Sequence, residues 1–315
     1  MSRLAYELNT APQQNVKPSN HAGQLWERLA PYAFISPFFI GFVIFQLFPI
    51  AFSIFLSTQQ WNPYKQGAEA FEFIGFQHFT NLLKDDRFWN SLRVTFLITS
   101  TCTIFGTALA VILATLIDKV PDWLSNILRA AFFMPAVTSV VVIAYIWKQL
   151  LSTEYGAVNA FLVSIGMQPQ NWLGDANLAV WSIIIMLIWA GLGWDSLILT
   201  AALRAIPEEY YEAAKLDGAN GIQEFFSITI PLLRPTLLFL ITTGLIFLLG
   251  LFAQVNLMTG GNPAHRTDTI ALYLYEQAFG RQEFGYASAL AVTLTLIMFA
   301  ASYVNFRFFG SDGES

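Results

Sequence analysis

"EYYEAAKLDGANGIQEFFSITIPLLRP" occupies Glu209–Pro235 and interrupts a chain that is otherwise strongly apolar. The chain has 315 residues, of which 55% are hydrophobic and 12% are charged, and its mean hydropathy is +0.52. The quoted stretch instead carries several charges, a glycine-containing turn and two prolines, with long apolar runs on both sides. A polar insert between two such runs indicates a connection that leaves the bilayer between two membrane spans.

Six apolar runs are long enough to cross a bilayer as helices. Five of them, at 29–64, 94–117, 130–147, 235–265 and 284–306, contain no Asp, Glu, Lys or Arg, and the run at 177–203 contains one acid, Asp195. A helix needs about 20 residues to cross roughly 30 Å of hydrocarbon. The runs are too long and too uniformly apolar for the strands of a closed barrel, the other structure that crosses lipid. The predicted fold class is therefore an all-α integral membrane protein, with six transmembrane helices near 31–57, 91–117, 128–150, 178–203, 235–257 and 286–308.

The distribution of Lys and Arg favours a cytoplasmic location for both termini. With six spans and an inside N-terminus, nine of the 16 Lys and Arg residues face inward and seven face outward. The connection at 118–127 carries Lys119, whereas the longer connection at 151–177 carries neither Lys nor Arg. No secretory signal pattern precedes the first span, so we expect that span to be retained. The expected organisation is a cytoplasmic arm at 1–28, a transmembrane domain at 29–309 with a cytoplasmic loop at 204–234, and a cytoplasmic tail at 310–315.

The sequence lacks the residues that several classes of function require. A net charge of −5 and the absence of a Lys/Arg cluster argue against nucleic acid as a partner. His21, His78 and His265 are far apart and show no metal-ligand spacing, so we expect no metal site. The sequence contains neither a nucleophile elbow nor a phosphate-binding loop, and we expect no catalytic residue and no ATP hydrolysis by this chain. The single Cys102 cannot form an internal disulfide.

The polar insert predicts two short helices separated by a turn. Pro207 suits a first helical turn, and the two acids after it place negative charge near the positive end of the helix dipole. Gly218 is typical of the residue that ends a helix, and Asn220 followed by Gln223 is an N-cap pattern. A helix held outside the bilayer fits a groove on a partner protein or the lipid surface. Its excess of acids favours the protein partner.

The stretch Glu212–Pro231, EAAKLDGANGIQEFFSITIP, resembles the EAA signature of binding-protein-dependent ABC importer permeases. The signature consists of Glu-Ala-Ala, three residues, Gly, nine residues and Ile-x-Leu-Pro, and this sequence departs from it only at Ile230, where Leu is usual. Other stretches, such as RAAFFMPAVTSVVVIAYIWKQLL and TDTIALYLYEQAFGRQEFGYASALAV, resemble the sugar-importer branch. They are most similar to the maltose-type first permease subunit, and the resemblance covers roughly residues 29–307.

This resemblance implies a type I ABC importer permease that forms half of a translocation pathway in a bacterial-type inner membrane. In that family the EAA helix is a coupling helix that docks on a cytosolic ATPase. The resemblance also implies a second permease subunit, two ATPase subunits that bind ATP and Mg, an extracytoplasmic solute-binding protein and a sugar-like substrate. No cofactor is expected in this chain itself. The positions that carry the coupling role are Tyr211, Glu212, Ala213, Ala214 and Gly218.

Candidate substrate contacts centre on the fourth span. Asp195 is the one acid inside a predicted span, and an ionisable side chain there normally faces a cavity or a partner. Trp194 adjoins it, and stacking of an aromatic ring on a sugar, together with a carboxylate that accepts its hydroxyls, is familiar carbohydrate chemistry. In maltose-type subunits the positions that match Gly191 and Trp194 lie on the substrate face. Ser139 and Gln254 are further polar candidates for the pathway.

Purely structural roles are open alternatives for these residues. Trp194 is also suited to packing at a helix interface, Asp195 to a wet position near the cytoplasmic end, and a span hydroxyl to bonding back to its own helix. The fifth span carries Leu248 and Leu251 where maltose-type subunits carry polar residues. The partner permease is then expected to make most of the substrate contacts.

Two other function classes compete with the importer interpretation. A self-sufficient secondary transporter or channel would carry coupling residues in several spans and internal repeats, and this chain shows one intramembrane acid and no visible repeat. A membrane enzyme would need a nucleophile, a histidine cluster or paired carboxylates, and no such constellation occurs.

Overall fold

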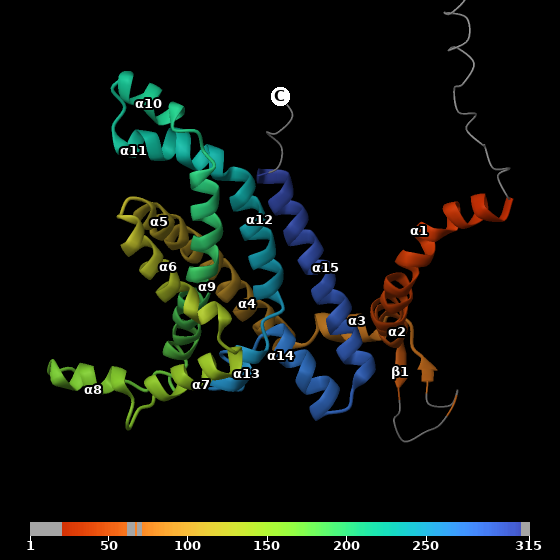
Figure 1. Ribbon diagram of the computed structural model, residues 1–315. Helices are drawn as coiled ribbons and strands as arrows, with labels where there is room; N and C mark the ends of the chain where they lie inside the picture. Colours follow the sequence, from red (N-terminus) through yellow and green to blue (C-terminus); the bar gives the residue numbers. More distant parts are fainter. Residues whose placement is uncertain (1–20, 62–66, 68–70, 310–315) are drawn as a thin grey trace, which may run out of the picture. The chain divides into compact units, whose positions relative to one another are not determined.

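The computed structural model describes residues 21–61, 67 and 71–309 (Figure 1). The chain divides into two compact units, residues 1–52 and 53–315. Most of the predicted arm at 1–28, up to residue 20, and the predicted tail at 310–315 lie outside the described residues.

The described part of the first unit is one long helical segment. Helix α1 (His21–Phe42) continues through a π-helical turn, η1 (Val43–Leu47), into α2 (Phe48–Leu56). Residues Leu29–Leu56 are long and apolar enough to cross a membrane, and none of their most apolar window is buried. Large side chains such as Phe34 and Phe45 are 87% and 79% exposed. A helix that is apolar on all sides is suited to contact with lipid.

The second unit contains four further segments, within the described residues, that are long and apolar enough to span a membrane. The first consists of α4 (Asp86–Thr101), η3 (Cys102–Gly106) and α5 (Thr107–Asp118), and the second is α9 (Leu178–Arg204). The third consists of α11 (Gly221–Glu224), η4 (Phe225–Thr229) and α12 (Ile230–Leu249), and the last is α15 (Phe284–Phe309). Their lengths and composition agree with an all-α membrane fold.

The range of the predicted third span, 128–150, differs from a single regular helix. It is covered by α6 (Asp122–Val137) and α7 (Val140–Leu150), which meet at an angle of 101°. Pro135 lacks the N–H that would continue the helical ladder, and Thr138 and Ser139 are extended, with ψ of 142° and 133°. The described residues therefore hold five candidate spans, or six if the bent pair counts as one.

Short elements gather at the two ends of the second unit. Helices α10 (Glu209–Leu216) and α11 lie at the same end as the last turns of α15, whereas α8 (Ala157–Ser164) and α13 (Ala253–Met258) lie at the opposite end (Figure 1). The second unit also contains other short elements. They are the antiparallel pair β1 (Gln59–Trp61) and β2 (Phe71–Phe73), α3 (Gln77–Leu83), α14 (Ile270–Tyr275) and the π-helical turn η5 (Glu276–Gly280).

Helix α9 is the centre of the packing because it contacts α5, α6 and α12. Two apolar clusters line it: one surrounds Ile183 and Met186 toward α7 and α13, and the other surrounds Leu199 toward α5 and α12. Gly193 marks the crossing with α6, since a Cβ atom there would lie 1.9 Å from the carbonyl oxygen of Phe132. Close approach of α6 and α9 thus depends on a residue without a side chain.

Candidate functional site

A cavity of about 470 Å³ lies between α6, α7, α9, α12 and η3. The bent pair of α6 and α7 forms part of its wall. Both Pro135 and Thr138 from the break line this space. Irregular backbone within a membrane protein is tolerated where it lines such a cavity.

Four of the five predicted pathway residues line this one cavity: Gly191, Trp194, Asp195 and Gln254. Ser139 is not part of the lining, although its neighbour Thr138 is. The bend explains this difference, since consecutive extended residues direct their side chains to opposite sides. Leu248 also lines the cavity, so its α12 side is largely apolar as the sequence indicates.

Two polar side chains of the cavity keep their hydrogen-bonding capacity. No described residue forms a hydrogen bond or an ion pair with the carboxylate of Asp195 or with the amide of Gln254, which is 8% exposed. The hydroxyls of Thr138 and Thr243 instead donate to Met134 and Phe239 of their own helices, at 2.9 and 2.8 Å. Asp195 and Gln254 are therefore free to bond a polar solute in the cavity.

Trp194 combines a packed and an open surface. Its ring lies 6.1 Å from that of Phe133 with an interplanar angle of 22°, and the residue is 52% exposed. The ring therefore agrees with both predictions for Trp194. It packs at a helix interface, against α6, and it also borders the cavity. Gly191 has open space around the position of a Cβ atom, which widens the cavity beside this ring.

The five predicted coupling residues lie together on α10 and at its end. The predicted helix end at Gly218 is confirmed: its φ is +81°, and the amide of Ala219 donates to the carbonyl of Ala214 at 2.9 Å. The predicted N-cap is also confirmed, since Asn220 and Gln223 form a reciprocal capping box at α11.

Helix α10 offers a free surface. None of its residues is buried, and Leu216 is 90% exposed. Tyr211 anchors the helix, because its hydroxyl lies 3.0 Å from that of Thr229 in η4. A hollow of about 290 Å³ beside it is lined by Ala214 and Gly218, among others. An anchored helix with an uncovered face is a suitable docking element for another protein.

The sequence analysis missed a polar network at the opposite end of the unit. Arg87 at the start of α4 donates to Asp268 at 2.7 Å and binds Glu276 through both terminal nitrogens. Asp268 is fully buried, and that burial raises its pKa despite the neighbouring guanidinium. The hydrogen bond from Arg87 lowers the pKa of Glu276. The polar residues around Asp268 were the available sequence signal for this network. No local pattern, however, could show that Asp268 pairs with Arg87, which is 181 positions away.

The family model described as "Binding-protein-dependent transport system inner membrane component" matches residues 106–308. A probable ABC transporter permease protein of Bacillus subtilis, YurN, is 32% identical over 292 residues, which cover 91% of this chain and 98% of the relative. The arabinooligosaccharides transport system permease protein AraP of the same organism is 29% identical over 290 residues and covers 90% of each chain.

A solved structure shares the fold. The crystal structure of a bacterial ABC transporter involved in the import of the acidic polysaccharide alginate contains a chain that is 27% identical, with a TM-score of 0.77. The match covers 90% of this chain and 99% of that one. The family model, the relatives and the fold agree with one another, and this chain belongs to the family of inner membrane components of binding-protein-dependent transport systems.

Proposed function

We propose that this chain forms half of the translocation pathway of an ATP-driven importer for a saccharide. The observation that carries this proposal is the cavity beside α9, which is lined by an indole ring and by a carboxylate and an amide that have no partner among the described residues. Sugars present hydroxyl groups for the first two and an apolar ring face for the third. Family membership supplies the importer context, and the relative named for arabinooligosaccharides and the structure named for alginate support the solute class.

The largely apolar lining of the cavity favours a passage over a tight binding site. Asp195 and Gln254 supply two polar contacts, while Leu248 and Ile143 offer none. A solute that is held by few bonds moves on readily. The second permease subunit then contributes the remaining contacts from its own half of the pathway.

Helix α10 is the element that we assign to energy coupling. With six spans, nine of the 16 Lys and Arg residues, including those of the N-terminal arm, fall on the same side of the membrane as the 204–234 loop, which supports a cytoplasmic location. Its free face would dock on one of two cytosolic ATPase subunits, which would bind ATP and Mg. Tyr211 and Thr229 connect α10 with the start of the α12 segment, so a movement of α10 would reach the wall of the cavity.

The test is the ATPase activity of the complex reconstituted with its second permease and ATPase subunits, with and without loaded binding protein. We expect stimulation of the wild type by the loaded binding protein and loss of stimulation or assembly in Glu212→Lys and Gly218→Asp. Glu154→Lys is the matched control, since Glu154 is an exposed acid outside α10. Solute uptake by the isolated chain, unaffected by the two α10 variants, would contradict the importer function and favour a self-sufficient transporter.

A further inference from the structure

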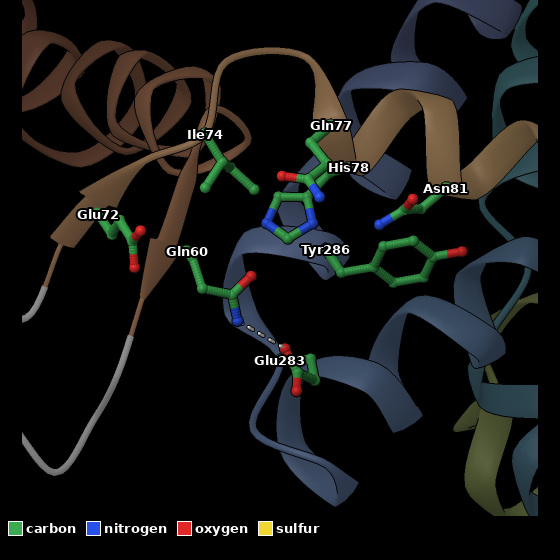
Figure 2. A pocket seen from close by; sticks show the side chains of 8 residues that line it. All are labelled: Gln60, Glu72, Ile74, Gln77, His78, Asn81, Glu283 and Tyr286. Carbon is green, nitrogen blue, oxygen red and sulfur yellow. Dashed lines mark hydrogen bonds between the residues drawn. The ribbon is translucent and has the colours of Figure 1, made fainter.

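A second pocket, of about 400 Å³, lies at the end of the unit opposite α10. The β1–β2 hairpin, α3 and the start of α15 form its walls, and Figure 2 shows the side chains that face it. Of the eight residues that line it, only Ile74 is aliphatic. The pocket therefore suits a polar or charged group, in contrast to the apolar cavity beside α9.

Close packing between the three walls makes the pocket a preformed feature. A Cβ atom at Gly285 would lie 2.3 Å from the carbonyl oxygen of Gln59 and 2.6 Å from Nε2 of His78. That carbonyl accepts a hydrogen bond from Nε2 at 3.1 Å, which fixes the ring against β1. His78 is 4% exposed, and no described residue bonds its Nδ1.

The charge of the pocket is negative. Glu72 from β2 and Glu283 before α15 line it, and none of its lining residues in the described part of the chain is Lys or Arg. Neither carboxylate forms an ion pair within the described residues, and Glu283 accepts only a long bond of 3.4 Å from Gln60. No group of three or more potential metal ligands occurs among these residues, so the arrangement does not favour a metal ion. A protein-borne ammonium or guanidinium group matches the two carboxylates better.

We propose that this pocket receives a Lys or Arg side chain of the extracytoplasmic solute-binding protein. The inference rests on the proposed function, which places this end of the unit outside the cytoplasm. Exposed amide side chains of Gln77 and Asn81 border the pocket, and such a polar rim is usual at transient protein interfaces. Complementary charge at such a contact sets partner choice and speeds association.

The experiment titrates the reconstituted complex with loaded binding protein and follows ATPase activity. We expect the double variant Glu72→Lys/Glu283→Lys to raise the half-saturating concentration of binding protein roughly ten-fold, with the maximal rate unchanged. The milder Glu72→Gln/Glu283→Gln should raise it less, and added salt should weaken wild-type association more than that of the neutral variant. Glu154→Lys is the control for a charge reversal elsewhere.

The two proposals fail in different ways. An unstimulated wild-type complex would contradict the proposed function. A stimulated wild type together with a half-saturating concentration that stays within about two-fold in the Lys double variant would overturn the docking pocket alone. Loss of basal activity at an unchanged half-saturating concentration would also overturn it, because the pocket would then serve the permease itself. Restoration of tight association by a Lys→Glu or Arg→Glu change in the binding protein would identify the inserted side chain.

Discussion

A missing methyl group at position 193 allows α9 to cross α6 at backbone distance. We expect Gly193→Ala to destabilise the protein by about 1–3 kcal/mol, since the added Cβ would overlap the carbonyl of Phe132. Gly191→Ala is a control in the same helix, because its Cβ would meet no atom within 4 Å. Thermal unfolding in detergent should show a lower transition temperature for the first variant only. Equal transitions would mean that α6 and α9 separate without cost.

In the proposed pathway, Asp195 is the cavity residue that we expect to contribute most to solute transport. Asp195→Asn keeps the shape of the side chain but removes its charge, and hydrogen bonds to charged groups contribute roughly 1.5–3 kcal/mol. We expect the rate of solute uptake by reconstituted complexes to fall about ten-fold or more, while assembly and half-saturation by the binding protein persist. Ser139→Ala should transport normally, because Ser139 does not line the cavity. Unchanged uptake by Asp195→Asn would remove this carboxylate from the pathway.

Among the elements, the start of α4 is held in place by acids whose protonation should control stability. Burial opposes ionisation of Asp85, but hydrogen bonds from Tyr273 and Tyr286 outweigh it and lower its pKa. A lowered pKa contributes stability above the unfolded value of about 3.9 and loses it as pH falls through the folded value. We expect the unfolding temperature to fall as pH drops below about 4, and to fall less in Asp85→Asn. Asp86→Asn, at an exposed neighbour, should follow the wild type.

Elements that depend on local sequence were predictable. The apolar runs indicate their spans, and the turn after α10 follows from Gly218 and the capping pair Asn220 and Gln223. The 101° bend between α6 and α7 was not predictable from the sequence. Proline occurs in many continuous membrane helices, and only tertiary packing decides whether the helix breaks there. The network around Arg87 was equally hidden, since its partners are about 180 or more residues away.

Across the whole molecule, the sequence indicated candidate residues for the cavity but not its walls. Resemblance and polarity pointed to Gly191, Trp194, Asp195 and Gln254, which two separate segments bring to one space. Ser139 was predicted from the sequence, but its neighbour Thr138 lines the cavity, and the extended conformation at the bend separates the two. The acidic pocket at the opposite end joins residues 60, 72, 78 and 283, and no local pattern predicts such a meeting.

The side of the membrane on which α10 lies decides whether the chain can meet a cytosolic ATPase. The only cysteine, Cys102, is 7% exposed, so single cysteines introduced elsewhere should dominate labelling by a membrane-impermeant maleimide. In intact cells that express the chain without its ATPase partner, we expect labelling of Tyr155→Cys but not of Leu216→Cys, at native side chains that are 71% and 90% exposed. Permeabilisation should make the second site reactive, because no residue of α10 is buried by the described part of the chain. The reverse pattern would place α10 outside the cell, where it could not contact a cytosolic ATPase. The coupling role of α10 and the proposed docking pocket would then both be contradicted.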